Sequence, residues 1–127
     1  MALVAALALH VLDEAVTNFL DVYNPLVLRI RSQLPWFPMP TFTFGVWLTG
    51  LIALVLVLAL LTPAIQRGSF GTRFASWVLA VIMFMNGVGH LAGSLYFRKW
   101  LPGATSAPLL LITSVALAHA VWSRRDR

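Results

Sequence analysis

Long stretches without a charged side chain dominate this sequence. The three charge-free intervals run from Arg31 to Arg67, from Arg73 to Arg98, and from Lys99 to Arg124. Each can hold the roughly 20 apolar residues that a membrane-spanning helix needs. Because backbone polar groups in hydrocarbon must be paired within the segment, spans of this kind are helices. We therefore expect an all-α fold, a four-helix transmembrane bundle in one domain, with helices at about residues 2–23, 41–61, 74–97 and 104–122.

The composition supports lipid as the natural solvent of the chain. Of its 127 residues, 60% are hydrophobic and only 10% are charged, whereas about a quarter of the residues in soluble domains are charged. The chain has no cysteine, which excludes disulfides and thiol chemistry. Any metal ion would have to be held by histidine and carboxylate side chains.

Basic residues give the chain a net charge of +5. They fall in groups between the apolar stretches: Arg29 and Arg31, Arg67 and Arg73, Arg98 and Lys99, and Arg124, Arg125 and Arg127. Such groups are typical of membrane edges, where they meet anionic headgroups, so we expect a lipid bilayer and not nucleic acid as the partner. The positive-inside rule favours cytoplasmic N- and C-termini by a single charge. We expect an integral protein of a bacterial-type plasma membrane, with no cleaved signal peptide.

The connection at residues 24–40 is long and rich in proline. Pro25 opens it, and Pro35, Pro38 and Pro40 close it. Residues 26–31 between them mix apolar and basic side chains, which is typical of a short amphipathic helix lying on the bilayer surface. We expect an interfacial anchor; the alternative is a lid that gates access for lipids.

Ionisable side chains interrupt the first apolar stretch. At 100° per residue, those of His10, Asp13, Glu14, Thr17 and Asp21 fall within an arc of about 100°, with Asn18 beside them. A charged residue at the centre of a membrane helix costs about 2.5–3.5 kcal/mol on insertion scales, and such residues face protein or trapped water. This polar stripe is therefore the leading candidate for the functional site.

The third predicted span offers a partner for the stripe. Asn86 and His90 are four residues apart and share a helix face with Gly89, Gly93 and Ser94. Small residues allow helix backbones to approach closely in membranes. Since the first and third spans run in the same direction, Glu14 and Asn86 lie at similar depth. We therefore predict one cluster of His10, Asp13, Glu14, Asn18, Asn86 and His90, and we place His119 at the interface.

Two short motifs match a known family. The first is His10-Val11-Leu12-Asp13-Glu14. The second is Asn86-Gly87-Val88-Gly89-His90, followed by the basic, aromatic and Pro-Gly residues of 98–105. In these residues the chain resembles the small integral membrane proteins named for an HXXEE motif. Asp13 stands where that family has the first Glu, which keeps the carboxylate and shortens it. The resemblance implies a shared site but does not indicate a reaction.

The residue types predict a membrane-embedded enzyme that acts on a lipophilic small molecule. His10, Glu14 and His90 would hold a divalent metal such as Zn or Fe. Asp13 would be a fourth ligand or a general base, so the catalytic candidates are Asp13, Glu14 and Asn86. Asn18 and Asp21 would orient the substrate.

Three other interpretations remain open at this stage. Without a metal, a protonated carboxyl beside a neutral histidine would be an acid–base pair suited to isomerising, cyclising or hydrating a lipid-like alkene or epoxide. A proton-coupled transporter would use the same residues as a relay, but so few helices would need a homodimer. Polar contacts that merely join helices contribute about 0.6 kcal/mol each, and Asn or Ser would suffice for that purpose.

Overall fold

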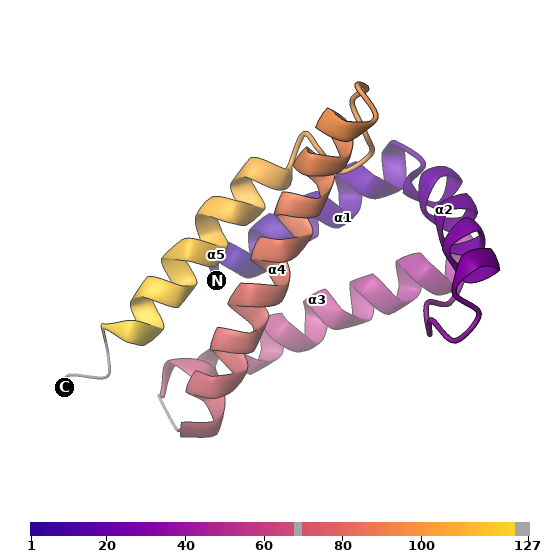
Figure 1. Cartoon of the computed structure of the whole chain (residues 1–127). Coiled ribbons are helices and arrows are strands. Elements are labelled where there is room, and N and C mark those ends of the chain that lie inside the picture. The colour runs from indigo at the N-terminus through magenta and orange to yellow at the C-terminus, as the bar shows by residue number, and fades with distance from the viewer. Residues whose placement is uncertain (68–69, 124–127) are drawn as a thin grey trace.

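The computed structural model describes residues 1–67 and 70–123, and within these ranges the chain forms five helices and no strand (Figure 1). The helices are α1 (Ala2–Val16), α2 (Phe19–Gln33), α3 (Phe44–Gln66), α4 (Phe70–Tyr96) and α5 (Ala107–Trp122). The expected all-helical fold is confirmed. The C-terminal arginines used in the orientation argument, Arg124, Arg125 and Arg127, lie outside the described residues.

The prediction of one continuous helix over residues 2–23 is wrong. α1 ends at Val16, and the axis of α2 is turned by 82° from that of α1. The turn is made at Asn18, whose backbone is left-handed (φ 58°, ψ 51°). Asparagine is one of the few residues other than glycine that adopts this conformation readily. Because of this break, α2 lies across one end of the molecule instead of extending α1 (Figure 1).

The remaining helix boundaries differ from the prediction by a few residues at most ends. α3 begins three residues later than expected and continues through Pro63 to Gln66, and α4 begins at Phe70. Pro25 was expected to open the connection, but it lies inside α2. The short amphipathic helix expected at residues 26–31 is also part of α2. α2 is therefore a helix of 15 residues that contains part of the predicted interfacial segment.

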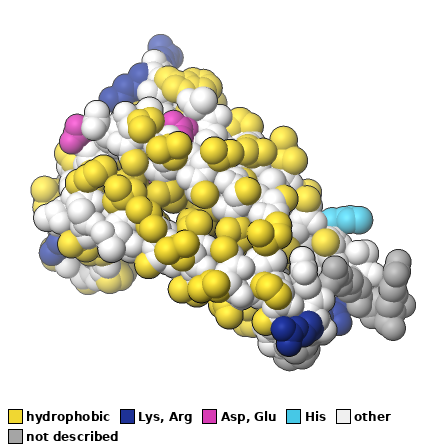
Figure 2. All heavy atoms as spheres, turned by 180° about the vertical axis from the view of Figure 1, so that it is seen from behind, with side chains coloured by type: hydrophobic (Ala, Val, Ile, Leu, Met, Phe, Trp, Pro, Cys, Tyr) yellow, Lys and Arg dark blue, Asp and Glu magenta, His cyan; other side chains and the backbone are white. Residues whose placement is uncertain are grey.

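Two of the helices, α3 and α4, are long and apolar enough to cross a membrane. α1 and α2 meet the same test only when they are taken together as one bent pair, and α5 is a shorter apolar helix of 16 residues. Apolar side chains cover most of the face shown in Figure 2, and Lys and Arg side chains lie towards its margins. This distribution suggests a membrane protein.

The helices pack around a small apolar core. α4 and α5 lie side by side along most of their lengths, and α1 packs against both α5 and α3 (Figure 1). The buried core side chains come from α1, α4 and α5: Leu3, Ala6, Leu7, Val11, Met83 and Leu110. This core fixes the N-terminal half of α1 against α5, and it thereby positions the polar residues in the last two turns of α1.

The close approach of α1 and α4 that we expected through small residues is not observed, because α4 packs chiefly on α5. A side chain at Gly87 would lie 2.9 Å from Leu111 Cγ and 3.2 Å from the Ala107 carbonyl oxygen, both of α5. Gly93 faces Leu101 of the following loop, and nothing lies within 4 Å of a Cβ placed at Gly89. The glycine that brings two helices together is therefore Gly87, and the helix it meets is α5.

We predict that Gly87→Ala lowers the thermal stability of the protein. The added methyl group would overpack the α4–α5 contact, at a cost of about 1–3 kcal/mol. Gly50→Ala is the matched control, because Gly50 of α3 has open space around its Cβ position and alanine favours a helix by about 1 kcal/mol. Thermal unfolding of both variants in detergent measures the effect. Equal melting temperatures for the two would contradict the assigned packing.

Candidate functional site

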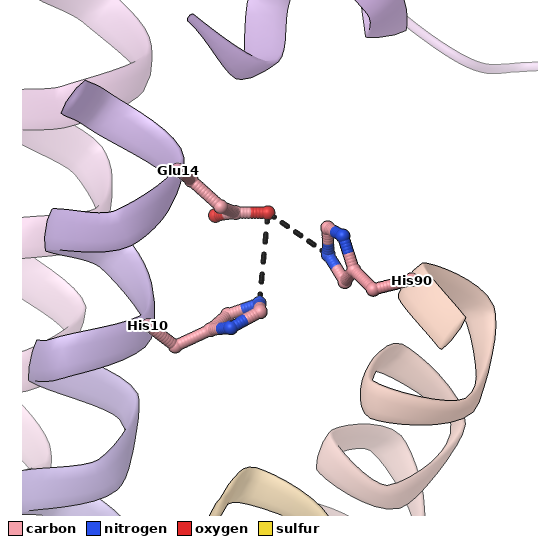
Figure 3. Close-up of side chains that lie close together, drawn as sticks. All are labelled: His10, Glu14 and His90. Carbon is pink, nitrogen blue, oxygen red and sulfur yellow. Dashed lines mark ion pairs between the residues drawn. The ribbon is translucent and has the colours of Figure 1, made fainter. Parts of the chain in front are cut away.

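Two histidines and a glutamate meet at the end of the molecule where α2 turns away from α1. His10 and Glu14 project from adjacent turns of α1, and His90 projects from α4 towards them (Figure 3). Glu14 Oε1 lies 3.6 Å from His10 Nε2 and 3.1 Å from His90 Nε2. The three residues are 1%, 5% and 8% exposed in the order His10, Glu14, His90. We call them the His–Glu–His cluster.

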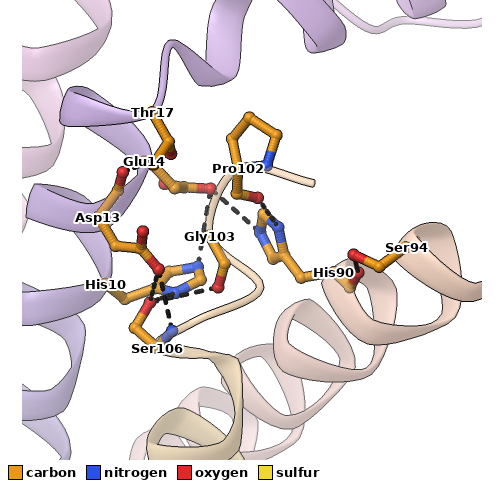
Figure 4. A network of polar contacts seen from close by, with 9 residues as sticks. All are labelled: His10, Asp13, Glu14, Thr17, His90, Ser94, Pro102, Gly103 and Ser106. Atoms are coloured by element: carbon orange, nitrogen blue, oxygen red, sulfur yellow. Dashed lines mark hydrogen bonds and ion pairs between the residues drawn. The ribbon is translucent and has the colours of Figure 1, made fainter. Parts of the chain in front are cut away.

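Asp13 and Ser106 fix the orientation of the His10 ring (Figure 4). Asp13 Oδ2 accepts hydrogen bonds from the Ser106 amide at 2.9 Å and from the Ser106 hydroxyl at 2.7 Å. His10 Nδ1 lies 2.7 Å from the same hydroxyl oxygen. Since a hydroxyl has one hydrogen and a carboxylate is a strong acceptor for it, His10 Nδ1 donates to the Ser106 oxygen. The neutral His10 ring then carries its proton on Nδ1 and a lone pair on Nε2.

The loop between α4 and α5 fixes His90 in the same way. His90 Nδ1 lies 2.7 Å from the Pro102 carbonyl oxygen, which can only accept, so Nδ1 is the donor and Nε2 carries the lone pair. The Ser94 hydroxyl accepts a hydrogen bond from the Leu101 amide at 3.1 Å and so ties the loop to α4. At Gly103 the backbone has φ 79°, and a Cβ there would lie 2.6 Å from His90 Cε1. Glycine is required at this position by conformation and by space.

Three electron-pair donors therefore converge with no hydrogen-bond donor among them. His10 Nε2, His90 Nε2 and Glu14 Oε1 all face the centre of the cluster (Figure 3). Within the described part of the chain, His10 Nε2 is buried and has no hydrogen-bond partner. A buried polar atom of this kind requires an explanation such as a bound ion or water. A cation, either a proton or a metal ion, would turn the mutual repulsion of these atoms into attraction.

The distances fit a metal ion. Each residue offers one ligand atom, and the three ligand atoms lie within 4.8 Å of one another. Atoms bound at about 2.0–2.1 Å to a tetrahedral Zn²⁺ are separated by about 3.3–3.4 Å. The Glu14–His90 and Glu14–His10 separations of 3.1 and 3.6 Å lie on either side of that value. The three ligand atoms together are bounded only by 4.8 Å, so the two histidine rings have to move closer to each other for the cluster to hold a tetrahedral metal ion.

The structure brings some of the predicted site residues together and leaves others apart. Asp13 lies beside the cluster, and its carboxylate accepts hydrogen bonds from Ser106. Asn86 is partly buried one turn before His90 and lines a cavity with it. Asn18 and Asp21 are exposed, one at the break and one in the first turn of α2, because α2 is bent away from the stripe that an unbroken helix would have formed. His119 is exposed near the end of α5.

Three neighbours of the cluster were missed by the sequence reasoning: Ser106, Pro102 and Gly103. Ser106 stands directly before α5, at the helix N-cap, where serine is common for local reasons. Its partners Asp13 and His10 are more than ninety residues away, which no local pattern indicates. The Pro-Gly pair belongs to the second family motif, and its glycine was the available signal that some group packs closely against the backbone.

Two cavities flank the helices. One, of about 250 Å³, is lined by residues of α2, α4 and the following loop, including Asn86 and His90. We call it the α2–α4 cavity. The other, of about 290 Å³, lies at the opposite end between α1, α3, α4 and α5, with Arg73 at its wall, and no residue of the His–Glu–His cluster lines it. The smaller cavity is therefore the one connected with the candidate chemistry.

Comparison with known proteins identifies a family but no characterised relative. A family model described as "protein of unknown function with HXXEE motif" matches residues 1–118. No curated protein and no solved structure matches the chain. The match covers α1 to α4 and most of α5, and thus all three residues of the cluster.

We predict that Asp13→Ala destabilises the fold by about 1–3 kcal/mol. The substitution removes the acceptor of the Ser106 amide and leaves the Ser106 hydroxyl only the Gly103 carbonyl, at 3.2 Å. An unsatisfied donor out of contact with water costs about that much. Asp21→Ala is the matched control, because Asp21 is an exposed acid in the first turn of α2. Thermal unfolding in detergent measures both. An equal loss in the two variants would contradict the role assigned to Asp13.

The hydrogen bonds also predict the tautomers of the histidines. His10 and His90 should both carry a proton on Nδ1, because Ser106 and Pro102 provide the acceptors. Nitrogen-15 NMR of histidine-labelled protein reports this directly, and the exposed His119 serves as the internal reference. Resonances typical of Nε2-protonated rings for His10 and His90 would contradict the assignment.

Proposed function

We propose that this chain, which belongs to the family of proteins of unknown function with an HXXEE motif, is a membrane enzyme that acts on a lipophilic small molecule with the help of a divalent metal. The proposal rests on one observation: three buried lone pairs, from His10, Glu14 and His90, converge on one point with no proton donor among them. Two imidazoles and a carboxylate are a ligand set that Zn²⁺ and Fe²⁺ both accept.

Each neighbouring residue has a defined part in such a site. A bound metal would supply Lewis-acid activation of a carbonyl group or of water. Ser106 and Pro102 hold the two rings with Nε2 directed inwards, as outer partners of metal-bound histidines commonly do. Glu14 supplies the negative charge that the metal requires. Asn86, in the cavity wall beside His90, is placed to orient a substrate.

The proposed setting is a bundle of four membrane crossings with the cluster near one boundary. The bent pair α1–α2 counts as one crossing, and α3 and α4 have the required length. α5 is about 24 Å long at 1.5 Å per residue, somewhat shorter than the roughly 30 Å hydrocarbon layer. The basic residues Arg29, Arg31, Arg98 and Lys99 fall at the cluster end of the chain's helices. The sequence assigns five basic residues to the other side, Arg67, Arg73, Arg124, Arg125 and Arg127. By one charge, the positive-inside rule therefore puts both termini in the cytoplasm of a bacterial-type cell.

A metal-free acid–base enzyme is the second candidate. The separation of 3.1 Å between Glu14 Oε1 and His90 Nε2 is also a hydrogen-bond distance. A single proton held between these two atoms would satisfy both and could be delivered to a substrate away from bulk water. The metal content of the protein distinguishes this candidate from the first.

We predict that the purified protein binds about one equivalent of Zn²⁺ or Fe²⁺, because three ligands at these separations act together. His10→Ala, His90→Ala and Glu14→Gln should each lose most of the metal while still folding. His119→Ala should keep it, since that histidine is exposed on α5. Elemental analysis of the four variants, with thermal unfolding as a test of folding, measures the outcome.

A steric variant completes this test. Gly103→Ala removes no ligand, but its Cβ would collide with the His90 ring, so we expect it to lose metal as well. Folded wild-type protein without metal, yet active, would favour the acid–base candidate. Failure of the ligand variants to fold would favour a purely structural role. Activity itself is sought by incubating wild type and Glu14→Gln with a membrane lipid extract and comparing the products by mass spectrometry; transport without product formation would contradict both enzyme candidates.

A further inference from the structure

The wall of the α2–α4 cavity is mostly apolar and contains a few polar groups. Its apolar side chains include Phe19, Val22, Leu26, Phe97 and Leu101. Among its polar lining residues are Asn86 and His90 of α4 and Tyr23 of α2. Ligand pockets typically combine an apolar lining with a few polar groups that fix orientation. The volume of about 250 Å³ lies just below the roughly 300–1,000 Å³ typical of such pockets, so a small ligand fits best.

The polar groups of this wall are mostly committed to other partners. The Tyr23 hydroxyl donates to the Pro40 carbonyl at 3.0 Å, and the Pro102 carbonyl accepts from His90. The side-chain amide of Asn86 makes no hydrogen bond to another residue in the described ranges. The Asn86 side-chain amide, which can donate and accept, is therefore the uncommitted donor of this wall. A ligand with further acceptor groups would bury them without donors, at a cost of about 1–3 kcal/mol each.

The outer wall is held in place independently of any ligand. The Asn24 side chain of α2 donates to the Phe42 carbonyl at 2.9 Å and accepts from the Phe42 amide at 3.1 Å. The Phe19 ring stacks on Trp47 and lies 5.7 Å, centroid to centroid, from the His90 ring. These contacts keep α2 across the end of the molecule (Figure 1). The cavity is thus preformed, with His90 shared between it and the His–Glu–His cluster.

We infer that the α2–α4 cavity binds a lipophile with a single oxygen-bearing head group, a hydroxyl or a carbonyl, which the Asn86 amide holds next to His90. This inference rests on the proposed function, because it supplies the substrate class for the same site. The apolar tail lies among the side chains of α2 and the end of α4. Leu26, Gly89 and Phe97 are exposed at the cavity, so the tail would enter from the hydrocarbon of the bilayer.

Gly89 offers a way to close the cavity without touching the cluster. Gly89 lines the cavity, and nothing lies within 4 Å of a Cβ placed there. The Cβ of a leucine at this position would therefore meet no protein atom, and the side chain would reduce the space for a ligand. Gly50→Leu on α3 is the matched control, because Gly50 also has open space and is not a lining residue of either cavity described above.

The test uses 1-decanol that carries a diazirine in its chain, with the protein in nanodiscs. On irradiation, we expect labelling of residues in α2 and α4 that line the cavity. We expect at least a tenfold loss of this labelling in Gly89→Leu and no change in Gly50→Leu. The matching diazirine alkane without the hydroxyl should label the cavity less, and Asn86→Leu should abolish the difference between the two probes.

The possible outcomes separate the inference from the proposed function. Labelling that is spread over lipid-facing residues, or that persists in Gly89→Leu, would overturn the inference. Equal labelling by the alcohol and the alkane in the wild type would overturn the role of Asn86. The metal content of the same samples is measured separately and decides the metal-assisted function. A protein that binds metal but does not retain the alcohol would keep its proposed function and lose this substrate class.

Discussion

The site depends on the contact between the buried Glu14 carboxylate and the imidazole rings of two histidines. No Lys or Arg forms an ion pair with this carboxylate in the described ranges, and its partners are the Nε2 atoms of His10 and His90. A buried carboxylate is tolerated only with a compensating charge or hydrogen bonds. The surrounding chain turns both rings to present lone pairs to this oxygen, and the backbone passes so closely at Gly103 that no side chain fits there. These three residues could hold a cation.

Two adjacent acids have different tasks in this structure. Asp13 and Glu14 are neighbours in sequence, but successive side chains on a helix point about 100° apart. Asp13 therefore reaches the N-terminus of α5 and accepts two hydrogen bonds from Ser106, where a negative charge is also favoured by the helix dipole. Glu14 reaches His90. Asp13 thus joins α1 to the start of α5, and Glu14 joins α1 to α4. One histidine would suffice for the second contact, so joining helices does not account for the presence of two histidines at Glu14.

The sequence was sufficient for the helical class and for the core of the site. Helical spacing placed His10 and Glu14 on one face, and the depth argument paired Glu14 with Asn86 and put His90 into the same cluster. In the structure the residue that meets Glu14 is His90, one turn further along α4. The same argument failed for Asn18 and Asp21, since it assumed an unbroken helix. A residue with a left-handed backbone conformation does not change the spacing of apolar residues in the sequence. The bend at Asn18 was therefore not predictable from that spacing. Ser106 was missed because its bonds connect residues that are distant in the chain, and the contact of α4 with α5 at Gly87 depends on packing that no single segment encodes.

The hydrogen bond between Asp13 and the Ser106 amide also has a consequence for biosynthesis. α1, which contains His10 and both acids, leaves the ribosome before α5, but the serine that orients His10 directly precedes α5. The polar face of the nascent α1 must therefore wait, without its partner, until the chain has been made as far as Ser106. The site matures only when α5 is inserted, so a chain interrupted before that point would contain all three cluster residues in an incompletely oriented form.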